Sequence, residues 1–478
     1  MRESWRRLLV LYRSVLFLGL SLNLYGAPLT LEQYVGEVKQ KHDGVRALKE
    51  TSEAALLRAD EATLMTAPTL FANAQWMDDK KPTSNPAIMG TETKYQGYQL
   101  GVAKQFDFGL TAKLSYQINY TQILQASPAF IPYPNFYEAR PLLELSQSLL
   151  RNGFGRETGA MVDATRAQAK AESYMDSFKL KLNLAEAEMT YWGLAIAREL
   201  VSVQAESLDR AKKIKEWSSR RTKLELADQA DFLQAEAGFQ GRSLEYQAAL
   251  DELKAIERQF NRLRGIDSEE VKEELPTLDR AFIENLPVPE KKGEREDLKA
   301  AEEGKKAAEA AAGLGREKNL PNFDVYAQLA LNGRSEVVKD SVNDSIGKQY
   351  PTLAFGLKFS TPLDFGQIID DRAAYAKSLA AAELQYKRKL FETAQDWKDL
   401  NIRLVEAKNR LKLAVAIENA QEGKLKHERE RLKKGRSVTY QVLLFEQDFS
   451  AAQAIRLRTE SEILRTLAQM KTYKEEKL

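Results

Sequence analysis

The chain has 478 residues, and its 71 Lys and Arg nearly balance its 69 Asp and Glu, giving a net charge of +2. Without a basic excess to neutralise phosphates, this composition argues against a nucleic-acid-binding protein. Cysteine is absent, which excludes disulfides, thiolate metal sites, a nucleophilic Cys and a lipid-bearing N-terminal Cys. No apolar run after the N-terminus is long enough for a transmembrane helix, but a β-barrel, apolar only at every second position, escapes that test.

Residues 1–27 are predicted to be a secretory signal peptide. Arginines precede a short apolar core that begins at Val15, and the small residues Gly26 and Ala27 offer a cleavage site. The alternative is an uncleaved membrane anchor, which the shortness of the apolar core disfavours. We therefore expect the mature protein to leave the cytoplasm.

A helix is predicted from Leu29 to Met65, because its apolar residues mostly recur at three- and four-residue steps. Thr30, with Gln33 three residues later, matches a capping box at its start. Pro68 then interrupts the helical pattern, and about four β-strands are predicted within residues 68–150.

The clearest of these strands flank the tight turn Asp107-Phe108-Gly109. Between residues 110 and 121 apolar and polar side chains alternate without interruption, which gives the strand one apolar and one polar face. Such strands, with aromatics and with short turns at one end and long loops at the other, are typical of an outer-membrane β-barrel. The alternation alone fits equally well a half-buried sheet of a soluble β-sandwich.

Two very long helices are predicted, one from Phe154-Gly155 to about Arg220 and one from Phe365-Gly366 to about Lys434. Each would be about 100 Å long at 1.5 Å per residue. No single globular core covers such a helix, so we expect these helices to pack along others as a coiled coil or tube. A soluble coiled-coil scaffold is the alternative.

The second half of the chain repeats the first at an offset of about 210 residues. After the signal peptide we predict a first repeat at 28–264, a linker or equatorial region at 265–293, and a second repeat at 294–478. The second repeat is predicted to have a helix, two strands within 321–361, and long helices.

The predicted signal peptide, the duplicated helix–hairpin–long-helix units and the junction Gln-Ser-Leu-Leu-Arg-Asn-Gly-Phe-Gly at 147–155 together resemble the TolC family of outer-membrane efflux channels, or outer membrane efflux proteins. The resemblance implies an α+β membrane protein: a trimeric outer-membrane β-barrel continuous with a long periplasmic α-helical coiled-coil tunnel. It implies passive conduction of solutes, in efflux or type I secretion, from a periplasmic adaptor (membrane fusion) protein and an inner-membrane transporter to the outside. The location would be the outer membrane of a Gram-negative bacterium, in contact with its lipid, with a large periplasmic part.

A homotrimer also follows from the strand count. Six strands are too few for an open pore, and open sheet edges cannot face lipid. Three protomers would close an 18-stranded barrel with an aqueous lumen. The family's commoner number is four strands per protomer; if the hairpin around residues 107–109 folds outside the membrane, the barrel would have 12 strands.

The resemblance places a gate at the periplasmic tips of the long helix pairs. Asp228 and Asp231 match acidic positions in the first repeat, and three copies of each would form carboxylate rings that favour cations. The family's best-known acidic pair lies in the second repeat, where this chain has Gln441 and Leu444. All four are gate candidates; the alternative for Asp228 is that it only caps the helix after the turn.

The same tips match the segments where adaptors dock. The candidate docking residues are Leu226, Ala227, Gly435, Arg436 and Ser437.

No enzyme activity, metal site or cofactor is expected, because the sequence has no catalytic triad or Walker motif. The two histidines, His42 and His427, lie in helical, highly charged surroundings. Gly153, Gly155 and Gly366 are interpreted as backbone freedom at sharp strand-to-helix changes. The alternative functions are a periplasmic adaptor and a periplasmic coiled-coil scaffold without a pore.

Overall fold

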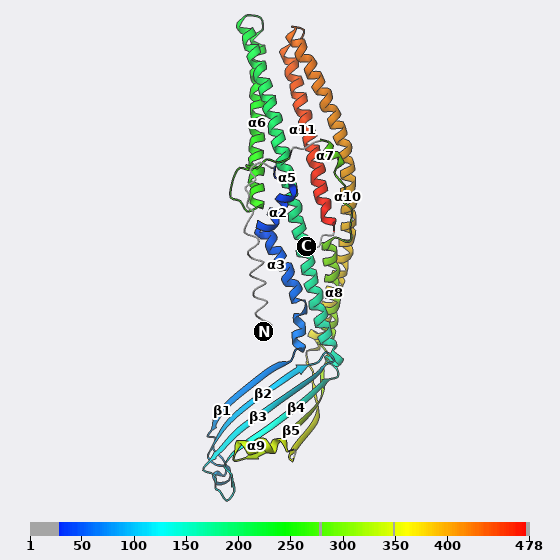
Figure 1. Cartoon of the computed structure of the whole chain (residues 1–478). Helices are drawn as coiled ribbons and strands as arrows, with labels where there is room; N and C mark the ends of the chain where they lie inside the picture. The colour runs from blue at the N-terminus through cyan, green and yellow to red at the C-terminus, as the bar shows by residue number, and fades with distance from the viewer. Residues whose placement is uncertain (1–27, 277–279, 348, 475–478) are drawn as a thin grey trace, which may run out of the picture. The chain divides into compact units, whose positions relative to one another are not determined.

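The computed structural model describes residues 28–276, 280–347 and 349–474, so the predicted signal peptide lies outside the described residues (Figure 1). The described chain combines long helices with one antiparallel sheet. It divides into two compact units. The first unit contains the described residues up to Ala47, Leu180–Lys292 and Trp397–Lys474, and the second contains Leu48–Lys179 and Gly293–Asp396. Both units draw on both predicted repeats, and the repeat boundaries stay a prediction.

The helices include two that are far longer than the rest. They are α5, with 68 residues, and α10, with 69 residues. The helices are α2 (Leu31–Lys41), α3 (Asp43–Leu57), α4 (Pro86–Met89), α5 (Arg156–Lys223), α6 (Gln229–Leu263), α7 (Arg280–Asn285), α8 (Glu296–Glu317), α9 (Val338–Ile346), α10 (Phe365–Lys433) and α11 (Thr439–Met470), with 3-10 segments η1 (Arg58–Thr66), η2 (Gly153–Gly155) and η3 (Lys471–Tyr473). Across the described part of the chain, no helix combines the length and the apolar character needed to cross a membrane.

An aromatic core in the first unit fixes the start of the described chain. The predicted capping box is confirmed, since the Thr30 side chain accepts from the Gln33 backbone while the Gln33 side chain accepts from the Thr30 backbone. The Tyr34 ring stacks on Phe260 of α6 with centroids 4.0 Å apart, and its hydroxyl donates to the Phe260 carbonyl at 3.2 Å. Tyr191 of α5 packs beside Tyr34 and is also buried.

The second unit contains the sheet. Its strands are β1 (Thr69–Asp79), β2 (Glu92–Gln105), β3 (Leu110–Leu124), β4 (Asn135–Ser148), β5 (Asn322–Leu331), β6 (Gly333–Ser335) and β7 (Pro351–Ser360). The order is β1-β2-β3-β4-β5-β7, with every neighbouring pair antiparallel, and β6 pairs with β4. Figure 1 shows β1 to β5 side by side. Because β1–β4 precede the long helix α5 and β5–β7 follow α8, the pairing of β4 with β5 joins the two parts of the chain.

Two elements between β5 and β7 were not predicted. They are the three-residue strand β6 and the helix α9, which packs against β4 and β6. The α9 sequence gave little signal, because the side chains it buries are the serines Ser341 and Ser345 rather than apolar ones.

Candidate functional sites in the sheet and at the helix tips

The register of the sheet gathers its apolar residues on one face. Directly paired residues of neighbouring strands point to the same side. One row across the six long strands is Leu70, Val102, Leu114, Leu143, Leu329 and Leu353. In this row Leu70 is 74% exposed and Leu353 71%, and Phe355 in a nearby row is 84% exposed. In a single chain the apolar side chains of this face, hereafter the apolar band, are therefore largely exposed.

Aromatic residues lie at both ends of the apolar band. The loop end has the pairs Trp76–Tyr98 and Tyr120–Tyr137, and the helix end, beside the turn 106–109, has Phe106–Phe108 and Phe323–Phe359. From Tyr98 to Phe106 the chain rises about 27 Å along the strand. With the strand tilt usual in barrels this becomes about 20 Å, close to the apolar height of about 25 Å in outer-membrane barrels.

The opposite face of the sheet is mainly polar. Asn73 donates to Gln99 at 3.3 Å, and Gln99 donates to Ser115 at 3.1 Å, so one hydrogen-bonded row crosses β1, β2 and β3. Lys113 of β3 forms an ion pair with Glu144 of β4 at 3.4 Å. Such a face suits contact with water.

The turn between β2 and β3 packs against the junction between β4 and α5. Gly155 has φ of +80°, and a Cβ built there would lie 1.5 Å from the Asp107 carbonyl oxygen. Asn152 and Phe154 also have positive φ, of 54° and 53°. Gly153 and Gly366 have no positive φ, so of the three predicted junction glycines only Gly155 uses the left-handed region.

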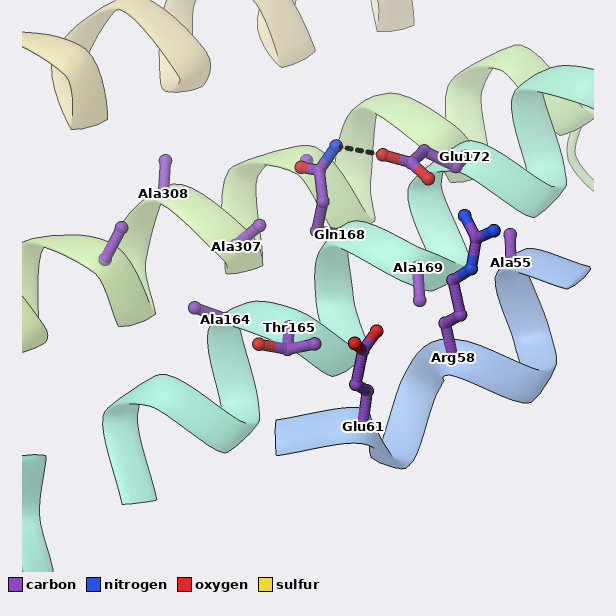
Figure 2. Close-up of a pocket in the computed structure, with 12 residues that line it drawn as sticks. Ala55, Arg58, Glu61, Ala164, Thr165, Gln168, Ala169, Glu172, Ala307 and Ala308 are labelled. Carbon is purple, nitrogen blue, oxygen red and sulfur yellow. Dashed lines mark hydrogen bonds between the residues drawn. The ribbon is translucent and has the colours of Figure 1, made fainter. Parts of the chain in front are cut away.

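A groove of about 560 Å³ lies in the second unit, among α3, η1, α5 and α8. Figure 2 shows small side chains along it, among them Ala164, Ala169 and Ala307, with Arg58 and Glu61 at its side. Sequence reasoning missed this groove, although the alanine-rich sequence of α8 was a signal for close approach by another chain segment.

In the first unit, the turns at the two helix tips are built alike. The Leu226 N–H donates to the Arg221 carbonyl at 2.9 Å, and the Arg221 guanidinium donates back to the Leu226 carbonyl at 2.9 Å. Arg436 and Arg431 form the same reciprocal pair in the other turn, at 2.9 and 3.2 Å. The second pair follows the first by about 210 residues, which is the offset predicted for the repeat.

The same equivalence holds for the backbone conformation of the turns. Glu225 has φ of 56° and Gly435 has φ of +70°, one residue before Leu226 and Arg436. The left-handed residue reverses the chain between the two helices of each pair, and glycine adopts it without steric cost.

The predicted gate residues lie at these tips. Asp228 is exposed at the N-cap of α6, Asp231 is half-buried in the first turn of α6, and on α11 Gln441 is half-buried and Leu444 is 37% exposed. The Asp228 side chain makes no capping hydrogen bond, which leaves the helix-capping alternative without support.

The predicted docking residues lie in the two turns and differ in exposure. Leu226 is 63% exposed, and Gly435 and Arg436 are exposed, whereas Ala227 and Ser437 are half-buried. The Ser437 hydroxyl donates to Glu428 of α10. This hydrogen bond, followed by the charge of Arg431, holds the pKa of Glu428 below its ordinary value.

A shared core joins the helix pairs behind the tips. It consists of Ile214, Ala235, Leu425, Leu432, Val442 and Phe449. Beside it, Glu446 of α11 is 3% exposed and forms ion pairs with Arg210 of α5 at 2.9 Å and with Arg429 of α10. Because Glu446 has a partner on both long helices, it ties the two helix pairs together.

Metal binding has no evident site in the described ranges, where no group of three or more His, Asp or Glu side chains is arranged to hold an ion.

The comparisons with known proteins agree with this architecture. The model of the family "Outer membrane efflux protein" matches residues 289–473. Residues 289–473 belong to the outer membrane efflux protein family. The resemblance inferred from the sequence is confirmed, and the family is one of transport channels rather than enzymes. No curated protein matches the sequence.

Solved structures similar to this chain include outer-membrane channels. The CmeC channel of Campylobacter jejuni has 14% identity and a TM-score of 0.68, covering 95% of this chain and 90% of CmeC. VceC of Vibrio cholerae has 15% identity and a TM-score of 0.67, covering 93% of this chain and 95% of VceC. The open MtrE channel of Neisseria gonorrhoeae has 16% identity and a TM-score of 0.65, covering 94% of this chain and 89% of MtrE. Outside residues 289–473 as well, the chain therefore has the fold of outer membrane efflux proteins.

Proposed function

We propose that the protein is a passive channel in the outer membrane of a Gram-negative bacterium, with a large periplasmic part, that exports solutes. The apolar band carries this proposal. It is bounded by aromatics, has a height close to that of the apolar belt of outer-membrane barrels, and lies back to back with a polar face. The band would contact lipid while the polar face lines a water-filled lumen.

The same sheet supports a trimer. Six strands leave β1 and β7 as open edges, and unpaired backbone groups cannot face lipid. β1 leads away from the helix end and β7 returns to it, so β1 of one copy can pair antiparallel with β7 of the next. Three copies would close a barrel of about 18 strands, a size with an aqueous lumen.

The groove in the second unit fits a neighbouring copy as well. Leu384 and Phe391 of α10 lie two turns apart on one helix face and are 66% and 65% exposed. Six of the twelve residues that line the groove are alanines, which let a neighbouring helix approach closely. In the trimer, α10 of one subunit would lie in the groove of the next and so build the wall of a periplasmic helical tunnel.

The helix tips would then carry the gate and the partner contacts. Three copies of Asp228 and Asp231 around one axis would concentrate negative charge and favour cations. Gln441 and Leu444 are the matching candidates of the second repeat. The exposed turns around Leu226 and Arg436 would bind a periplasmic adaptor that connects the channel to an inner-membrane transporter.

Conductance of the purified full-length protein in a planar lipid bilayer tests the channel. We expect discrete steps that require a bilayer, and protein that extracts from membranes only with detergent. A protein that stays in the aqueous phase and gives no steps would support the periplasmic scaffold or adaptor and overturn the channel.

The gate is tested in the same bilayer with the double variant Asp228→Ala/Asp231→Ala. Removing two rings of carboxylates is expected to weaken cation selectivity and block by divalent cations several-fold. The matched control is Glu216→Ala, which removes one carboxylate from α5 away from the turn. Unchanged currents in the double variant would contradict the gate assignment while leaving the channel itself intact.

A further inference from the structure

Helix α9 sits directly on the backbone of the sheet. A Cβ built on Gly333 of β6 would lie 1.9 Å from the Ser341 carbonyl oxygen and 2.4 Å from the Ser345 nitrogen. Only the missing side chain at Gly333 allows the helix to approach this closely. Ser341 and Ser345 are fully buried in this contact.

The register shows on which face of the sheet α9 lies. Gly333 pairs with Ala139, Ala139 with Ile118, and Ile118 with Tyr98, so the helix covers a row of the apolar band. Ala139 is 0% exposed beneath it. The Tyr116 hydroxyl, on the same face, lies 3.1 Å from the Ser345 hydroxyl.

The serines of α9 face the sheet, and its apolar residues lie on another side of the helix. The two serine hydroxyls donate to the Val338 and Val342 carbonyls of α9 itself, so they need no water. Val338, Val342 and Ile346 form a separate stripe, about 80° around the helix from the serines at 100° per residue. Val338 is 42% exposed and Ile346 63%.

The remaining side of α9 is charged or polar and exposed. It consists of Lys339, Asp340, Asn343 and Asp344. At 100° per residue this polar side, hereafter the polar flank, is centred about 130° from the apolar stripe and faces largely away from the sheet.

The position of α9 along the strands matches the edge of the apolar band. Its row contains Tyr98, which packs against Trp76 at the loop end. The next rows on this face toward the loops end in Asp78 paired with Lys94, both charged. The apolar band thus ends where α9 lies.

We propose that α9 lies in the plane of the outer membrane at its outer boundary, with Val338, Val342 and Ile346 in lipid and the polar flank toward headgroups and water. This inference rests on the proposed function. A two-flanked helix of this kind is stable at an interface, where each flank meets its own solvent. Because this apolar stripe lies beside the apolar band, we infer that lipid, rather than a protein partner, covers it.

Single-cysteine labelling tests the proposal, and the chain offers a background free of cysteine. Ile346→Cys, Asn343→Cys and Leu100→Cys would each be labelled with an environment-sensitive dye in phosphatidylcholine vesicles. We expect quenchers attached near the lipid headgroups to quench the dye at 346 at least threefold more than at 343. Aqueous iodide should show the reverse order.

The label at 100 distinguishes a failure of the α9 proposal from a failure of the proposed channel. If the dye at 100 is quenched from the lipid but the dye at 346 only by iodide, α9 is not interfacial and the inference is overturned, while the channel stands. If the dye at 100 is itself in water, the proposed function fails.

Gly333→Ala provides a second variant. Because the added methyl group collides with the α9 backbone, lipid quenching at 346 should fall while quenching at 100 stays constant. Unchanged quenching at 346 would show that docking on the sheet does not position the helix.

Discussion

At the scale of single residues, Gly155 is the most constrained position in the sheet unit. Its left-handed conformation and its contact with the Asp107 carbonyl leave no room for a side chain. We expect Gly155→Ala to lower the free energy of unfolding by about 2–4 kcal/mol, because strain and collision add. Denaturant unfolding of the detergent-solubilised protein, followed by circular dichroism, measures this change.

Gly366→Ala is the matched control. Gly366 lies in the first turn of α10 with a negative φ, and the nearest atom to an added Cβ is 3.6 Å away. Alanine there should be neutral or slightly stabilising. Equal losses in both variants would show that the junction does not depend on the left-handed glycine.

Residue-scale features could be predicted where the signal is local. The capping box of Thr30 and Gln33 needs only four residues of sequence, and it was predicted correctly. The left-handed Asn152 and Phe154 could not be predicted, since they follow from the contact with the turn at 106–109. Glu446 was missed for the same reason, because its partners lie on two other helices.

At the scale of elements, we expect the same substitution to change stability differently on the two faces of the sheet. Leu100 lies in the apolar band, 56% exposed, and Gln99 lies in the polar row between Asn73 and Ser115. If the apolar band contacts lipid as proposed, an arginine at 100 would lie in hydrocarbon and should cost about 2–4 kcal/mol. Gln99→Arg lies on the polar face, which the proposed function places in water, and should cost much less.

Reversible unfolding in lipid vesicles compares the two variants. A larger loss for Gln99→Arg than for Leu100→Arg would reverse the assignment of the faces. In detergent instead of lipid, the difference between the two losses of stability should be smaller, because a micelle can deform around the arginine charge.

Elements with a strict period could be predicted from the sequence, and short ones supported by neighbours could not. The alternation from 110 to 121 predicted β3, and β3 extends over Leu110–Leu124. Helix α9 lacks an apolar face toward the sheet, and β6 has only three residues. Both depend on Gly333 opposite Ala139, a pairing between segments far apart in the sequence.

At the scale of the whole molecule, closure of the barrel is the central prediction. Cysteine pairs on the polar face of the sheet sample the possible registers between β1 of one copy and β7 of the next. They combine Phe71, Asn73 or Gln75 of β1 with Thr352, Ala354 or Gly356 of β7. Disulfides need Cβ atoms about 3.5–4.5 Å apart, so we expect only pairs directly opposite each other to form them. The products should be covalent dimers and trimers.

Single-cysteine variants are the controls. They should give no covalent dimers or trimers, because equivalent strands would not meet in the proposed trimer. A disulfide that joins β1 to β7 within one chain would show that six strands close on themselves. That result, or no disulfide from any pair, would contradict the trimeric barrel.

The junction between β4 and β5 also sets an order of events during synthesis. Ser148 and Asp324 bond at 2.7 Å although they are 176 residues apart in the chain. At a translation rate of 5–20 residues per second, β4 is made roughly 10–40 s before its neighbour. During that interval strands β1–β4 expose apolar surface and the unpaired edge of β4, and both features promote aggregation. If the chain is exported to the outer membrane, as the proposed function requires, we expect residues 69–148 to need protection from aggregation until the C-terminal strands have been made.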